Sequence, residues 1–145
     1  MAYQHKIVRR VEFSDTDMAG IMHYSNFFRF METAEHSFFR SLGFSVMMSD
    51  LDPPLGWPRV HAECDYKRPL RFEEEIEVRL LVKEKRSKSI SFQFRFRKTH
   101  ETEEAARGLV TVVCVTWDET GRIQARSIPD FISEKIVIAP AELLV

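Results

Sequence analysis

The stretch Tyr24-Ser-Asn-Phe-Phe-Arg-Phe-Met-Glu-Thr-Ala-Glu-His-Ser-Phe-Phe-Arg-Ser-Leu42 decides the fold, because its apolar residues recur with the period of an α-helix. At 100° per residue these side chains cover about half of the circumference, and polar residues fill the rest. Gly43 follows directly, at the position where a left-handed residue commonly ends a helix. The helix therefore needs a broad apolar surface to cover it. The apolar set is Phe27, Phe28, Phe30, Met31, Ala34, Phe38, Phe39 and Leu42.

Strand-like segments on both sides of this helix supply such a surface. Most of them alternate apolar and polar residues, whereas Gly108–Trp117 is apolar on both faces, which is typical of a central or doubly covered strand. Short joints at Lys85–Ser89 and His100–Glu104 predict hairpins and an antiparallel sheet. Pro129 opens a predicted short helix that ends at Lys135. The predicted strands are Lys6–Ser14, Arg59–Tyr66, Glu75–Lys83, Ile90–Arg97 and Gly108–Trp117.

One amphipathic helix and one antiparallel sheet predict an α+β fold. The simplest arrangement is a curved sheet of about five strands wrapped around the helix. A chain of 145 residues fits a single domain, so we expect one domain over residues 1–145.

Composition excludes several classes of protein. The formal net charge of −1 argues against a bulk electrostatic grip on nucleic acid. Cys64 and Cys114 are too few for a disulfide framework, and no Cys/His cluster indicates a metal site. The chain shows neither a secretory signal nor an apolar run long enough to span a membrane. We therefore expect a cytoplasmic protein without a metal or other cofactor.

The loop before the helix carries the most informative polar residues. Asp15 and Asp17 lie between the first strand and the helix start, followed by Gly20. The first N–H groups of a helix lack internal partners and carry partial positive charge, so they polarise a carbonyl or bind an oxyanion. A carboxylate opposite them supplies a base or a nucleophile, as ester or thioester hydrolysis requires. The alternative is that both aspartates only cap or turn the chain.

Several motifs in this region resemble one known family. Asp15-Thr-Asp-x-x-Gly20, Tyr24-x-Asn-Phe27 and Phe30-Met-Glu-x-Ala34 are similar to the hotdog-fold acyl-CoA thioesterases of the 4-hydroxybenzoyl-CoA thioesterase type. Lys67-x-Pro69 and Ile128-Pro129 extend the likeness over nearly the whole chain. The resemblance implies a hotdog fold and hydrolysis of an acyl-CoA thioester to a free acid and coenzyme A.

The resemblance also implies roles for individual residues. Asp17 would be the catalytic carboxylate, as nucleophile or general base, and the Tyr24 backbone N–H would polarise the thioester carbonyl. Gly20 would let the loop backbone pass close to the substrate. The coenzyme A phosphates would lie near Arg86 and Lys88, although a solvated charged hairpin remains the alternative.

Three further residues have two interpretations each. Many members of that family have Tyr-His or Trp-Tyr where this chain has His23-Tyr24. His23 either contacts the substrate or is a surface histidine at the helix entry. His61 either lines the pocket or is solvated on its strand. Glu35 falls in the apolar arc of the helix, and we expect it to pair with an arginine across an interface. The segment Phe44–Trp57 is predicted to form a lid or to pack between protomers.

An acyl-CoA thioesterase is thus the leading hypothesis. The rivals are an acyl-carrier-protein thioesterase and a non-hydrolytic module that binds acyl thioesters. Unpaired edges of a single curved sheet favour association with a second copy. We therefore expect a homodimer or homotetramer with the site at the interface, and no nucleic-acid or membrane partner.

Overall fold

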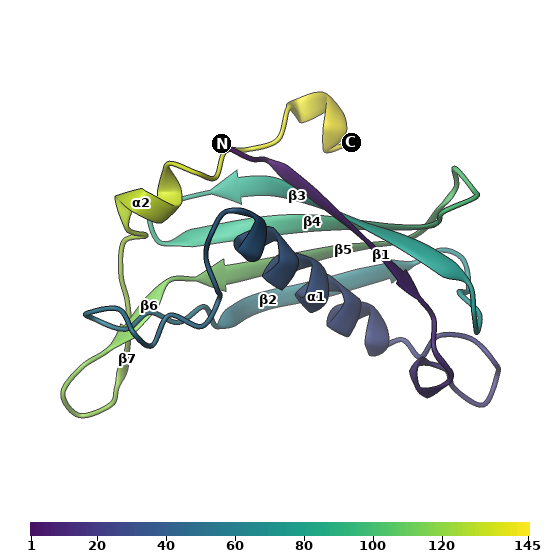
Figure 1. Ribbon diagram of the computed structural model, residues 1–145, viewed down its shortest axis with the longest axis horizontal. Helices are drawn as coiled ribbons and strands as arrows, with labels where there is room; N and C mark the ends of the chain where they lie inside the picture. The colour runs from purple at the N-terminus through teal and green to yellow at the C-terminus, as the bar shows by residue number, and fades with distance from the viewer.

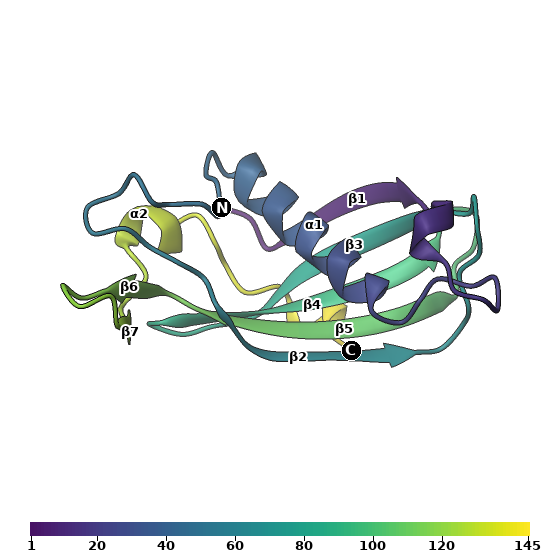
Figure 2. The same cartoon turned by 90° about the horizontal axis from the view of Figure 1, so that it is seen from below.

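The computed structural model describes residues 1–145 as one antiparallel sheet with a long helix across one face (Figures 1 and 2). The five strands lie in the order β1-β3-β4-β5-β2, so β1 and β2 form the two edges. The predicted α+β class and the five-stranded antiparallel sheet are confirmed. The elements are β1 Gln4–Arg10, α1 Asn26–Ser41, β2 Arg59–Tyr66, β3 Glu75–Lys85, β4 Ser89–Lys98, β5 Glu104–Val113, β6 Val115–Trp117, β7 Ile123–Ala125 and α2 Asp130–Ser133.

The apolar arc of α1 forms the centre of the core, as its periodicity predicts. Phe30, Ala34, Phe38 and Phe39 are fully or almost fully buried. The ring of Phe38 meets that of Phe92 on β4 edge to face, with centroids 6.0 Å apart. Aromatic side chains of α1 therefore join the helix to β4, and the helix lies closest to β1 and β3.

The first strand ends earlier than the sequence predicts. β1 stops at Arg10, and Phe13 lies in a short 3₁₀ turn with its side chain 78% exposed. The turn forms because the Asp15 carboxylate accepts a hydrogen bond from the Glu12 N–H at 2.9 Å. This local bond competes with strand pairing, so the apolar residue at position 13 does not continue the alternation.

The predicted strand Gly108–Trp117 is also wrong at both ends. β5 begins at Glu104, and its pairing to Arg97 shows that the hairpin closes there. The strand begins with Glu104, Ala105 and Ala106, and alanine and glutamate are uncommon in strands, so the sequence pattern does not predict this start. At the other end the chain leaves the sheet at Cys114, whose carbonyl accepts a bond from the Arg126 N–H. Val115 then opens the small β6–β7 pair.

The edge strand β2 is exposed on most of its length, although its alternation predicts one buried face. Val60 is 62% exposed and Tyr66 47% exposed, because nothing covers the β2 edge within this chain. Wrapping of the helix by the sheet stays a prediction. The Phe44–Trp57 segment packs on its own chain, where Trp57 meets Phe39 at 5.6 Å between ring centroids.

No helix of the structure is both long and apolar enough to cross a membrane. Likewise, no group of three or more His, Cys, Asp or Glu side chains is placed to hold a metal ion.

Candidate functional site

A cleft of about 530 Å³ opens between the loop before α1, the first turn of α1 and the end of β2. Its walls are mixed, with apolar side chains at the floor and charged ones at the rim. Two residues singled out from the sequence, Asp17 and Tyr24, line it together. The full lining is Asp17, Ile21, Met22, Tyr24, Phe27, Tyr66, Lys67, Arg68 and Pro69.

A tight loop holds the Asp17 carboxylate in place. The Asp17 N–H donates to the Ile21 carbonyl at 2.9 Å, and Asp17 Oδ1 accepts from the Ala19 N–H at 2.8 Å. Gly20 closes this loop with a φ of +79°, which explains why a glycine is needed there. Asp17 Oδ2 makes no hydrogen bond within the chain, so one carboxylate oxygen stays available for chemistry.

Asp15, unlike Asp17, does not line the cleft, and it instead holds the loop against the start of α1. Its backbone carbonyl accepts hydrogen bonds from the His23 N–H and from Asn26 Nδ2, each at 2.8 Å. These bonds tie the aspartate loop to the start of α1. For Asp15, the geometry therefore agrees with the capping or turn role that was the alternative for both aspartates.

The Tyr24 N–H is free to bind an added acceptor. It has no hydrogen-bond partner in the structure, and it lies just before α1, which begins at Asn26 rather than at Tyr24 as predicted. The backbone carbonyl of Tyr24 does have a partner, because Tyr66 Oη donates a hydrogen bond to it at 3.0 Å. An unpaired backbone N–H beside a helix start can bind a carbonyl oxygen or a developing oxyanion.

Tyr66 is a site residue that the sequence reasoning missed. A tyrosine hydroxyl is protonated at neutral pH and so can donate, and desolvation raises the pKa of Tyr66 further, to about 12. Its ring also packs edge to face against Phe27, with centroids 4.9 Å apart. The available signal was its place at the end of the alternating strand, but nothing in the sequence showed that this end reaches Tyr24.

Cations at the rim of the cleft are paired with glutamates. Lys67 lies 2.5 Å from Glu104, and Arg68 pairs with Glu103. Although burial works against it, hydrogen bonds from Arg107 and Lys67 lower the pKa of Glu104. Glu104 is therefore an anion at neutral pH, and it holds Lys67 at the mouth of the cleft.

The two candidate histidines do not line the cleft within this chain. The His23 ring stacks on the Tyr24 ring, with centroids 4.5 Å apart, and its Nδ1 meets Ser25 Oγ at 2.8 Å. His61 lies on the outward side of β2, 3.2 Å from Glu63. His23 thus borders the site, whereas His61 lies away from it.

Arg86 and Lys88 lie far from Asp17 in the same chain. They form the β3–β4 turn, whereas the Asp17 loop lies at the other end of the sheet (Figure 1). The eleven residues of β3 alone span about 35 Å. Arg86 Nε lies 2.6 Å from Glu84 Oε1, on an exposed surface. These cations and Asp17 therefore serve one site only if they come from different copies of the chain.

The predicted partner of Glu35 is an arginine, but it belongs to the same chain rather than to a second protomer. Glu35 Oε2 pairs with Arg59 on β2, and Oε1 is buried without a partner. Burial raises the pKa of Glu35 to about 7, against the opposing effect of Arg59. Glu35 is eleven residues beyond Tyr24, about 16 Å along a helix, so it does not share a reacting atom with the Tyr24 N–H.

Comparison with known proteins gives a family match over most of the chain. A model of the thioesterase-like superfamily matches residues 11–136. A 1,4-dihydroxy-2-naphthoyl-CoA hydrolase of Gloeothece citriformis is 30% identical over 108 residues, which cover 74% of this chain and 76% of that protein. The family match therefore includes the aspartate loop, α1 and every strand of the sheet except β1.

Two further similarities support the match. A protein of Aquifex aeolicus, named provisionally as an esterase, is 43% identical over 77 residues, which cover 52% of this chain and 59% of that protein. The solved structure of a gentisyl-coenzyme A thioesterase superposes with a TM-score of 0.75 at 32% identity, covering 88% of this chain and 98% of that one. Both the sequence and the whole architecture thus agree with the superfamily.

Proposed function

Because this chain belongs to the thioesterase-like superfamily, we propose that it is an acyl-CoA thioesterase of the hotdog fold. It would hydrolyse an acyl-CoA thioester to a free acid and coenzyme A. The observation that carries the proposal is that Asp17 and Tyr24 line one cleft. Neither Asp17 Oδ2 nor the Tyr24 N–H has a hydrogen-bond partner in the chain. The aspartate and helix-start motifs support the 4-hydroxybenzoyl-CoA thioesterase type within the superfamily.

The proposed chemistry uses these two groups on opposite sides of one carbonyl. The thioester oxygen accepts a hydrogen bond from the Tyr24 N–H, which stabilises the negative charge that develops on it. Asp17 Oδ2 either attacks the carbonyl carbon or takes a proton from an attacking water. The carbon–sulfur bond breaks, and coenzyme A leaves as a thiolate that takes up a proton from the water consumed. When Asp17 is the nucleophile, the acyl group first forms an anhydride with its carboxylate, which water then hydrolyses. In both cases water supplies the oxygen of the acid and Asp17 is regenerated.

A panel of thioesters tests the proposal directly. The relatives are named for naphthoyl and gentisyl thioesters, so aromatic acyl-CoAs belong in the panel beside short, medium and long ones. Release of free thiol supports hydrolysis, whereas binding without turnover favours an acyl-thioester-binding module. Faster turnover of acyl-carrier-protein thioesters than of the matching CoA thioesters favours an acyl-carrier-protein thioesterase.

The hairpin cations are proposed to hold the coenzyme A phosphates. Arg86→Ala and Lys88→Ala should then raise KM for acyl-CoA by about 10-fold and change kcat little, because remote contacts persist equally in the ground and transition states. A pantetheine thioester that lacks the nucleotide is the control substrate. An equal loss on both substrates would show that the hairpin does not hold the nucleotide.

We propose a homodimer or homotetramer, because this hairpin and Asp17 can serve one site only when they come from different copies of the chain. At substrate concentrations well below KM, an Asp17→Asn chain mixed with an Arg86→Ala chain should be more active than the average of the two separate variants, since one hybrid site receives Asp17 from one chain and Arg86 from the other. The same mixture made with two Asp17→Asn chains is the control. A mixture that is no more active than the average of the separate variants, or a fully active species at 17.0 kDa, would contradict the shared site.

Tyr66 is proposed as a positioning residue for the Tyr24 peptide. Tyr66→Phe removes the donor to the Tyr24 carbonyl and keeps the ring that packs on Phe27. We expect kcat to fall about 5- to 10-fold, the scale of one lost hydrogen bond, with KM nearly unchanged. A proportional rise in KM instead would indicate a contact to bound substrate.

A further inference from the structure

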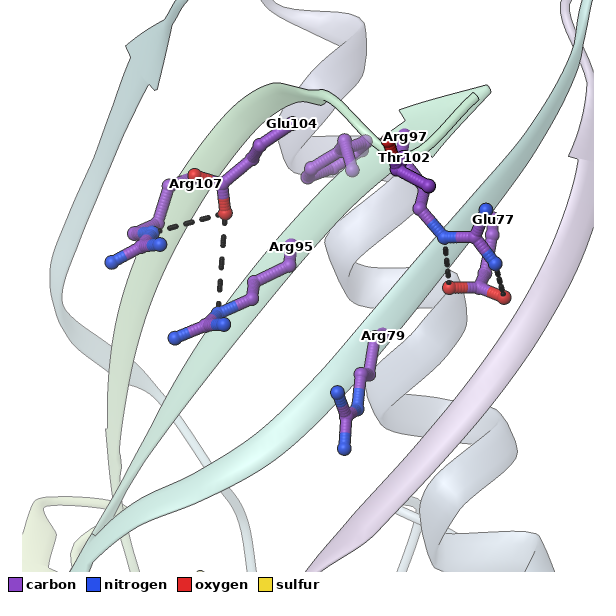
Figure 3. Close-up of a pocket in the computed structure, with 8 residues that line it drawn as sticks. Glu77, Arg79, Arg95, Arg97, Thr102, Glu104 and Arg107 are labelled. Atoms are coloured by element: carbon purple, nitrogen blue, oxygen red, sulfur yellow. Dashed lines mark hydrogen bonds and ion pairs between the residues drawn. The ribbon is translucent and has the colours of Figure 1, made fainter. Parts of the chain in front are cut away.

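An arginine-lined pocket lies on the face of the sheet opposite α1 (Figure 3). Its volume is about 260 Å³, and the sheet forms most of its floor. The even alternation of β4 explains the placement, because Phe94 and Phe96 face the core while Arg95 and Arg97 face outward. The lining is Glu77, Arg79, Arg95, Phe96, Arg97, Thr102, Glu104 and Arg107.

One cross-strand row of this pocket is balanced in charge. Arg97 on β4 lies opposite Glu77 on β3 and opposite Glu104 on β5. Two hydrogen bonds of 2.8 and 2.9 Å join the Arg97 guanidinium to the Glu77 carboxylate. Opposite charges in directly paired positions stabilise a sheet, so this row is complete without any ligand.

The next row is entirely cationic. Arg79 on β3, Arg95 on β4 and Arg107 on β5 are direct cross-strand partners, and Figure 3 shows their side chains on one surface. Lys6 on β1 continues the row beside Arg79, and only Asp65 on β2, opposite Arg107, carries the other sign. Like charges in directly opposite positions destabilise a sheet.

Few carboxylates are available to this row. Arg79 contacts only the Gln4 amide oxygen, and no ion pair joins it to a carboxylate. Glu104 is 3.0 Å from Arg107 and 3.9 Å from Arg95, but it also binds Lys67. Arg95 otherwise donates to Gln93 Oε1 and to the Val145 carbonyl.

The cations also affect each other. Burial, followed by repulsion from Arg107, lowers the pKa of Arg95, and Arg79 adds to this effect. Six side chains of the pocket are charged, four arginines against two glutamates. The pocket therefore has a positive excess within a space large enough for a small anion.

We propose that the Arg79–Arg95–Arg107 row is a binding site for a small multivalent anion of the phosphate class. Neighbouring strands are about 4.8 Å apart, so the row presents guanidinium groups over about 10 Å. Guanidinium forks match phosphate oxygens and bind them through charge-assisted hydrogen bonds. The site lies on the outer face of the sheet, away from the Arg86 hairpin. It shares no lining residue with the Asp17 cleft, and the Glu104–Lys67 ion pair lies between the two.

Pyrophosphate binding to the intact protein tests the site. Calorimetry should show saturable binding to the wild type, and Arg79→Gln and Arg95→Gln should each weaken it at least about 10-fold. Arg122→Gln is the matched control, because it removes one exposed positive charge outside the pocket and should leave the affinity unchanged. Absent binding, or an equal loss in Arg122→Gln, would overturn the proposal.

Thermal unfolding gives a second readout that does not depend on catalysis. Without added anion, Arg95→Gln should raise the melting temperature, since it removes the centre of the cationic row. Pyrophosphate should raise the melting temperature of the wild type and not that of Arg95→Gln. A variant that melts lower than the wild type and still responds to pyrophosphate would overturn the proposal.

Coenzyme A is a second source of the same phosphate chemistry. If its nucleotide occupies the row, Arg79→Gln weakens coenzyme A binding as strongly as pyrophosphate binding. If a free anion is the ligand, Arg79→Gln binds coenzyme A like the wild type and loses only pyrophosphate. Both results support the phosphate-class site, and unchanged affinity for both ligands contradicts it.

Discussion

Asp17→Asn should lower kcat/KM for the best thioester substrate at least about 100-fold, the scale of a lost acid–base or nucleophilic group. The amide keeps an oxygen that accepts from the Ala19 N–H, so the loop should hold its shape. What disappears is the charged oxygen facing the cleft. Steady-state rates and a circular dichroism spectrum on the same preparation measure both effects.

Asp15→Asn is the matched control in the same loop. Its side chain only accepts a hydrogen bond from the Glu12 N–H, and asparagine retains that acceptor. We expect less than about a 10-fold loss for this variant. Wild-type turnover in folded Asp17→Asn, or equal losses in both variants, would remove Asp17 from the catalytic role.

Glu35→Gln should flatten the dependence of folding stability on pH. The pKa of Glu35 is raised from 4.5 to about 7, so the folded state holds this proton more tightly than the unfolded state. The contribution is fully present below pH 4.5 and is lost as pH rises through 7. At about 1.4 kcal/mol per pKa unit the loss is about 3 kcal/mol.

Denaturant unfolding at pH 5 and pH 8 measures this effect. The free energy of unfolding of Glu35→Gln, relative to the wild type, should increase by up to about 3 kcal/mol from the lower to the higher pH. Glu119→Gln, an exposed carboxylate away from Glu35, is the control and should show little change. A constant difference across this range would show that Glu35 ionises normally in the folded protein.

The sequence alone determined the parts of this protein that depend on neighbouring residues. The period of Phe27–Leu42 predicts α1 and its buried face, because helical geometry brings residues three and four apart onto one side. The alternation of Ile90–Arg97 predicts β4 in the same way. Asp17 and Gly20 were also found locally, since a carboxylate and a left-handed glycine before a helix form one short loop.

Only the tertiary structure decided the contacts between residues far apart in the chain. Tyr66 reaches the Tyr24 carbonyl across 42 positions, and Arg59 reaches Glu35 across 24. The cationic row on the outer face depends on the register of neighbouring strands, which a shift of one residue would abolish. Register and edge position follow from how the whole core packs, and no local pattern of side chains encodes them.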